Sequence, residues 1–175
     1  MRSQLLLIPA ALYLAAEPAS AGVYFLTGEQ AQQLLFPKAT FTEDFRILTD
    51  RQYRLIKEDA VAPITDRTVR MWKVSTGGWF FIDQVEGLDT TVTYALGLDD
   101  NGAVTGIEVI ECLVDYAKVR QHEWLAQFKG KKYGSLQKKG EIENISGTTR
   151  SSVHITEGVR KLLTAFRILV QQPSS

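Results

Sequence analysis

The sequence has one cysteine, no net charge and no long apolar run, and each of these limits excludes a class of protein. Because Cys112 is alone among 175 residues, the chain can form neither an internal disulfide nor a cysteine-based metal site. The 20 basic residues balance the 20 acidic ones, so we expect no binding to nucleic acid. No segment has the roughly 18 to 20 apolar residues of a membrane-spanning helix, so we expect membrane contact only through a partner.

Two further absences concern catalysis and the cysteine itself. The sequence contains neither a G-x-S-x-G nor an H-E-x-x-H motif, and we identify no catalytic residues and no metal ligands. Cys112 lies in an apolar run, so we expect a buried structural thiol.

The first 21 residues have the pattern of a secretory signal peptide. Arg2 precedes an apolar stretch of about a dozen residues, and Ala19-Ser20-Ala21 forms a small-residue cleavage site. We expect cleavage after Ala21 and a periplasmic or extracytoplasmic protein, with an uncleaved anchor as the alternative.

The rest of the chain predicts a single α+β domain, with an antiparallel sheet and helices packed on it. Residues 22–67 are expected to form an N-terminal helix and a connecting segment, and residues 68–172 the main domain. The helix begins at a capping box, Thr27-Gly28-Glu29-Gln30, and ends at Phe36-Pro37. Its apolar face is predicted to consist of Ala31, Leu34 and Leu35, whereas residues 38–66 show no clear pattern.

Hydrophobic alternation and turn residues predict the strands and later helices of the main domain. Strands are expected at 69–74, 78–85, 90–98 and 104–114, with turns at Thr76-Gly77-Gly78 and Asp99-Asp100-Asn101-Gly102. Helical spacing predicts an amphipathic helix over 116–128, stopped by Gly130, and a last helix over about 152–171.

Residues 143–152, Glu-Asn-Ile-Ser-Gly-Thr-Thr-Arg-Ser-Ser, carry the clearest chemical signal. The segment is rich in hydroxyls and runs into a helix, whose first turn presents unpaired N–H groups and a partial positive charge. These groups bind phosphate, Gly147 allows close approach of the backbone, and Arg150 could add a charged donor. From the residues alone, a phosphate cradle and a cluster of helix-capping hydroxyls are equally good interpretations.

The same segment resembles the flavinylation motif of the FMN-binding domain family, Asp-x-x-Ser/Thr-Gly-Ala-Thr-x-Thr/Ser. That family includes the covalently flavinylated subunits of the sodium-pumping NADH:quinone reductase and of the Rnf complex. Ser146, Gly147, Thr149 and Ser151 match the motif. Glu143 stands at the Asp position, a mild departure, and Thr148 stands where the family has Ala. The resemblance implies FMN as the cofactor, attached by a flavin transferase through a phosphoester to Ser151, with the adjacent Ser152 as the alternative acceptor.

Further matches extend the resemblance over roughly residues 68–165. They are Asn101 to Val109 before an apolar strand, Trp124 to Lys131 at the end of a helix, and Thr156 to Arg160 in the last helix. His154 lies close enough to the cradle to contact the phosphate or flavin, although a solvated or packing role fits equally well. Tyr116 or Trp79 could stack on the flavin, or belong to the core.

The resemblance implies an exported flavoprotein that transfers electrons between redox proteins. It would be an electron carrier or a subunit of a redox complex rather than a stand-alone enzyme. Expected partners are a membrane quinone or Fe–S complex, or a multihaem cytochrome. Two alternatives remain: a non-flavin binding or sensory module with a decayed motif, and a flavin reductase component of a larger enzyme.

Overall fold

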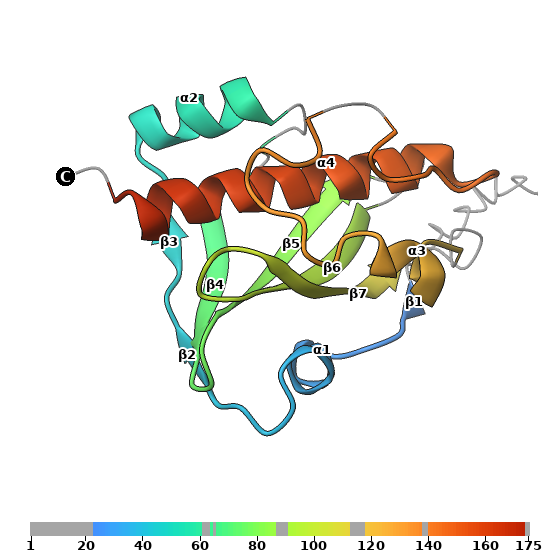
Figure 1. Cartoon of the computed structure of the whole chain (residues 1–175), viewed down its shortest axis with the longest axis horizontal. Helices are drawn as coiled ribbons and strands as arrows, with labels where there is room; N and C mark the ends of the chain where they lie inside the picture. The colour runs from blue at the N-terminus through green and yellow to red at the C-terminus, as the bar shows by residue number, and fades with distance from the viewer. Residues whose placement is uncertain are drawn as a thin grey trace, which may run out of the picture.

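Four long strands form the centre of an antiparallel sheet (Figure 1). This computed structural model describes residues 23–60, 64, 66–86, 91–112, 118–137 and 140–173, so the predicted signal peptide lies outside the described residues. The central strands are β4 (Thr68–Val74), β5 (Trp79–Glu86), β6 (Thr91–Leu98) and β7 (Val104–Cys112). Shorter strands lie at or beside the edges: β1 (Val23–Tyr24), β2 (Phe41–Glu43) and β3 (Arg46–Ile47). The order is β1-β7-β6-β5-β4-β2, and β3 also pairs with β4.

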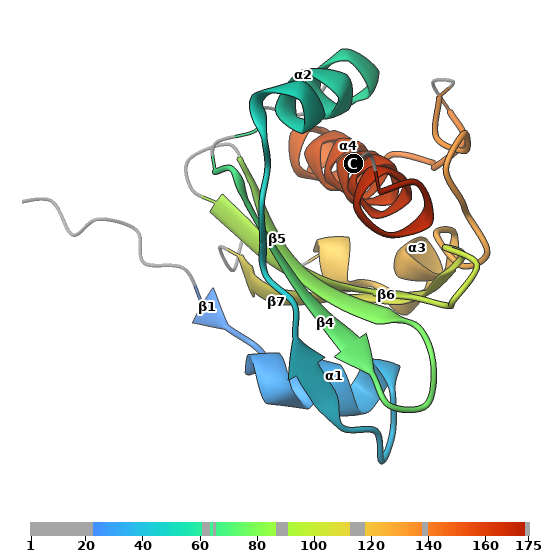
Figure 2. The same ribbon diagram turned by 90° about the vertical axis from the view of Figure 1, so that its left-hand side faces the viewer.

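Helices cover both faces of this sheet (Figure 2). Helix α4 (Thr149–Phe166) runs along one face and continues into a π-helical turn, Arg167–Gln171. Helix α1 (Gly28–Leu35) lies on the opposite face, α2 (Asp50–Asp59) packs on α4, and the short α3 (His122–Ala126) contacts β7. The α+β fold class is therefore confirmed. Within the described ranges, no helix combines the length and apolar character needed to cross a bilayer.

The two covered faces give the sheet two hydrophobic cores. Phe80 and Phe81 are adjacent and fully buried, because successive side chains of a strand point to opposite faces. Phe81 belongs to the larger core with α4, whereas Phe80 belongs to the smaller core with α1. Cys112 is fully buried in the larger core, as predicted, and burial raises the pKa of its thiol.

The predicted strands and turns are present, but three helical predictions need correction. Leu34 is 57% exposed rather than packed against the sheet. The helix expected over 116–128 is instead a 3₁₀ segment at 118–120 followed by the five-residue α3, with residues 113–117 outside the described part. Its N-cap, Gln121, makes no side-chain capping hydrogen bond, so packing of Trp124 and Leu125 maintains this short helix. The last helix begins at Thr149, three residues earlier than expected.

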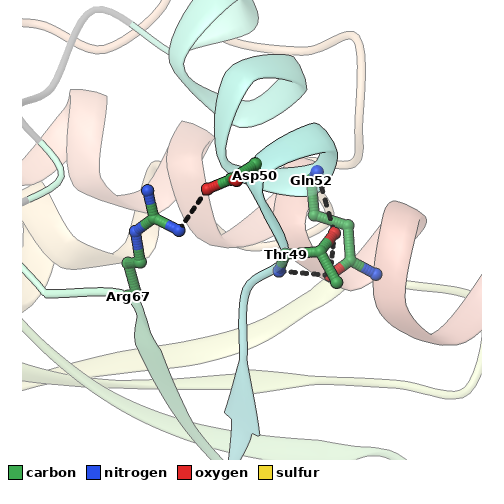
Figure 3. Close-up of polar contacts among 4 residues, drawn as sticks. All are labelled: Thr49, Asp50, Gln52 and Arg67. Carbon is green, nitrogen blue, oxygen red and sulfur yellow. Dashed lines mark hydrogen bonds and ion pairs between the residues drawn. The ribbon is translucent and has the colours of Figure 1, made fainter.

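Residues 38–66, which show no clear sequence pattern, contain β2, β3 and the whole of α2. Helix α2 begins with a reciprocal capping box: Gln52 N–H donates to Thr49 Oγ1 at 3.3 Å, and Thr49 N–H donates to Gln52 Oε1 at 3.0 Å (Figure 3). Asp50 in the same turn pairs with Arg67 at 2.6 Å. The predicted capping box at Thr27 and Gln30 has the same geometry.

Replacement of Thr49 by Ala should lower the free energy of unfolding by about 1 kcal/mol, because the first turn of α2 loses its capping acceptor. Urea denaturation followed by circular dichroism measures the change. Thr76→Ala, in the exposed β4–β5 turn, is the control and should be near neutral. Equal effects of the two substitutions would contradict a capping role for Thr49.

Helix α4 approaches the sheet closely at Gly158. A Cβ at this position would lie 2.6 Å from both Tyr94 Oη and Val85 Cγ1, so only glycine fits. Tyr94 Oη–H donates to Asp83 at 2.8 Å, and Lys161 of α4 pairs with the same carboxylate at 2.8 Å. Burial, together with the Asp83 charge and hydrogen bond, holds the pKa of Tyr94 well above its ordinary value, so the phenol stays a neutral donor.

Gly158→Val should therefore destabilise the protein by about 2 kcal/mol, since α4 must move away from Tyr94 and Val85. The matched control is Glu157→Val, which introduces the same β-branched side chain at the adjacent, partly exposed position. Chemical denaturation of both variants separates overpacking from helix propensity. A Gly158→Val protein as stable as the control would show that the contact can relax freely.

Candidate flavin site

The hydroxyl-rich loop is fastened to α3 by two hydrogen bonds at Glu143. Trp124 Nε1–H donates to the Glu143 carbonyl at 2.7 Å, and Glu143 N–H donates to Gln127 Oε1 at 2.9 Å. Two parts of the sequence that match the family separately are thereby joined in space. Sequence reasoning gave no role to Trp124 and Gln127 in the site, although both lie in a matching stretch.

A tight turn carries the chain from this anchor into α4. Thr148 N–H donates to the Ile145 carbonyl at 3.1 Å, and Gly147 has φ +86°. Residues that carry a side chain rarely adopt this left-handed backbone conformation, so the turn favours glycine at this position. A Cβ on Gly147 would lie 3.6 Å from Lys118 Nζ, which places the ammonium group beside the turn.

The first turn of α4 is electrostatically suited to an anion. Its N-cap, Thr148, makes no side-chain capping hydrogen bond, and the turn contains no acidic residue. Unpaired N–H groups and the helix dipole give this end a partial positive charge. The exposed Lys118 adds a full positive charge close by. Sequence reasoning missed Lys118, which no motif marks.

The two adjacent serines of α4 have different hydrogen-bonding states although both are buried. Ser152 Oγ accepts from Ile145 N–H at 3.4 Å, donates to the Thr149 carbonyl at 2.9 Å, and lies 3.4 Å from Asn144 Oδ1. By contrast, the Ser151 hydroxyl has no hydrogen-bond partner in the described structure, with 1% of the residue exposed. The Thr148 hydroxyl, at 4% exposure, is likewise unpartnered.

The remaining predicted residues lie around this point. Glu143, Ser146, Gly147 and Thr149 are exposed, and Thr149 Oγ1–H donates to the Ile145 carbonyl at 3.3 Å. His154 Nδ1 is hydrogen-bonded to the Glu86 carbonyl at the end of β5. A carbonyl oxygen only accepts hydrogen bonds, so Nδ1 carries the proton. The bond ties α4 to the end of β5.

Of the two aromatic residues considered for stacking, Trp79 lies near the other end of α4. Its ring packs on Phe166, with centroids 6.3 Å apart. Ser151 and Phe166 are separated by 15 helical residues, or about 22 Å at 1.5 Å per residue. Trp79 is thus a core residue distant from the cradle, and Tyr116 lies outside the described residues.

An open hollow adjoins the cradle on the α3 side. Its lining comes from α3 and the start of the loop: Gln121, Glu123, Trp124, Gln127, Glu143, Asn144 and Ile145. The mixture of indole, amide and carboxylate groups offers both apolar surface and hydrogen-bonding atoms next to the Gly147 turn and the start of α4.

These features suit the phosphate group of a cofactor. Burying an unpaired hydroxyl costs about 1 to 3 kcal/mol, and a phosphate ester or phosphate oxygen at Ser151 and Thr148 would remove that cost. The donor set of N–H groups, hydroxyls and one ammonium therefore fits the phosphate of FMN.

Comparison with known proteins agrees with this chemistry. Residues 87–164 match the family model of the FMN-binding domain, which supports FMN as the cofactor. The match contains all the predicted site residues. The fold resembles the crystal structure of Shewanella oneidensis NqrC, with a TM-score of 0.51 and 14% identity over 86% of this chain and 90% of that one. No curated protein sequence gives a significant match.

The two serines should respond oppositely to replacement by Ala in the FMN-free protein. Ser152→Ala should cost about 1 kcal/mol of unfolding free energy, because it removes the acceptor for the partly buried Ile145 N–H. Ser151→Ala should be neutral or slightly stabilising, because it removes an unpaired buried hydroxyl. Denaturation curves of the two variants, compared with wild type, check this order, and the reverse order would contradict the hydrogen-bond assignment.

Proposed function

We propose that this protein is an exported electron-transfer flavoprotein whose FMN is joined to Ser151 through a phosphoester bond. The observation that carries the proposal is the buried, unpartnered Ser151 hydroxyl in the first turn of α4, inside the segment that matches the FMN-binding domain. Such a hydroxyl has no competing partner to lose when it forms a bond to phosphorus.

The choice of Ser151 over Ser152 rests on their different roles in the loop. Ser152 Oγ links Ile145 and Asn144 to α4, so an ester at this oxygen would remove its proton and crowd these contacts. Thr148, which replaces the family's Ala, has a buried hydroxyl that makes no capping bond. That hydroxyl can donate to a phosphate oxygen, so the substitution is compatible with FMN.

The attachment is a phosphoryl transfer that needs an activated flavin nucleotide and a flavin transferase. The Ser151 Oγ–H bond is replaced by an Oγ–P bond, and the phosphoric anhydride of the flavin nucleotide breaks. The departing nucleoside monophosphate keeps the electron pair of the broken bond, and the serine proton passes to a base of the transferase or to water. The protein gains the mass of FMN less one water.

Bound FMN supplies the one- and two-electron redox chemistry, and the protein supplies attachment and environment. The signal-peptide pattern of residues 1–21 supports export, after which a covalent bond prevents loss of the flavin. The partners proposed are redox proteins, either a membrane quinone or Fe–S complex or a multihaem cytochrome. The proposed location is periplasmic or extracytoplasmic.

Intact-mass spectrometry tests the attachment. The full chain, co-expressed with a flavin transferase, should gain the mass of FMN less water and keep its yellow colour after denaturation. Ser151→Ala should abolish the gain, because no hydroxyl remains to form the ester. Peptide mapping should locate the flavin on residue 151.

Ser152→Ala is the matched control, and it should retain covalent flavin in the folded fraction. Flavin on Ser152, or modification that survives Ser151→Ala, would contradict the assignment. Colour that is lost on denaturation would show noncovalent FMN, and a colourless protein would favour the alternative of a module without flavin.

A further inference from the structure

Lys118 lies where the loop and the start of α4 come together, although it is distant from both in the sequence. The 3₁₀ segment at 118–120 holds it, with Val119 fully buried and Gln121 N–H donating to the Lys118 carbonyl at 3.0 Å. Its ammonium is beside Gly147, at 3.6 Å from the position that a Cβ would take there. A buried neighbour and a local hydrogen bond therefore fix the backbone from which this side chain extends.

The charge of Lys118 is not balanced by the described protein. The ion pairs of the described residues do not involve it. It adjoins the N-terminal end of α4, where the helix dipole is also positive and no acidic residue occupies the first turn. An anion placed between them would be attracted by both.

Two buried hydroxyls point independently to a ligand at this place. Ser151 Oγ and Thr148 Oγ1 are more than nine-tenths buried and lack hydrogen-bond partners in the described residues. Both belong to the helix start that Lys118 adjoins, and both can donate to phosphate oxygens. A cation, hydroxyl groups and helix N–H donors are the groups that recognise a phosphate.

We propose that Lys118 is the cation that pairs with the phosphate of FMN and positions it at the first turn of α4. This inference rests on the proposed flavin site but not on the covalent bond, because the same contact holds for a free phosphate monoester. Its single charge matches the single negative charge of a phosphodiester. Lys118 is thus a positioning residue, and it acts before and after attachment.

The test compares FMN with riboflavin, which lacks the phosphate, by flavin fluorescence titration. All variants carry Ser151→Ala, so covalent attachment does not contribute. In this background Lys118→Gln should raise the Kd for FMN about threefold to tenfold, the effect of losing one partly exposed charge-assisted contact. The Kd for riboflavin should change by less than about twofold, and Lys118→Arg should restore most of the FMN affinity.

Lys73→Gln is the matched control. Lys73 is an exposed lysine of β4, on the stretch of this strand that pairs with β2. It removes the same charge and should leave both affinities unchanged. Raising the salt concentration should weaken FMN binding more in the Ser151→Ala parent than in its Lys118→Gln derivative, since screening removes an interaction that the derivative lacks.

Three results would overturn the proposal: equal effects of the two lysine variants, parallel loss of FMN and riboflavin binding on Lys118→Gln, or a Ser151→Ala parent without measurable preference for FMN. Each can occur whether or not the wild-type protein is modified covalently. The intact-mass experiment on wild-type protein judges the attachment separately, so the failure of one proposal is distinguishable from the failure of the other.

Discussion

The packing of α4 across the sheet is the constraint on which the rest of the structure depends. The missing side chain at Gly158 lets the helix approach Tyr94 and Val85, and the Lys161–Asp83 pair fixes it laterally. Because a helix is rigid over two turns, this contact also fixes the position of Ser151. The chemistry therefore lies at the end of a well-packed element, where a cofactor can be held with little freedom.

The other side of the site is a loop, and its order comes from hydrogen bonds rather than from a core. Trp124 and Gln127 hold Glu143 from one side, and Ser152 holds Ile145 from the other. Between Ile145 and the start of α4, the turn at Gly147 is exposed to solvent beside Lys118. The loop satisfies Ser152 and leaves Ser151 unsatisfied, a local cost to stability that a bound phosphate would remove.

Local signals in the sequence predicted the elements well where one pattern dominated. The alternation of β4 and β5, the Asp99–Gly102 turn and the amphipathic last helix all reappear in the structure. Helix α2 was missed although Thr49 and Gln52 form the same capping box that identified α1. Its charged sequence contains few apolar positions, and only Ile56 is buried, so hydrophobic periodicity gave little indication of a helix.

The sequence by itself determined the fold class, the hydroxyl-rich helix start and the resemblance that led to FMN, because these depend on residues close together in the chain. Tertiary structure decided which of the two adjacent serines is hydrogen-bonded. It also decided the anchoring of Glu143 by α3 and the placement of Lys118 beside Gly147. Burial and hydrogen bonding depend on which distant segments meet, so neighbouring residues of the same type can have opposite roles. That difference separates Ser151, with its free hydroxyl, from Ser152, which holds the loop.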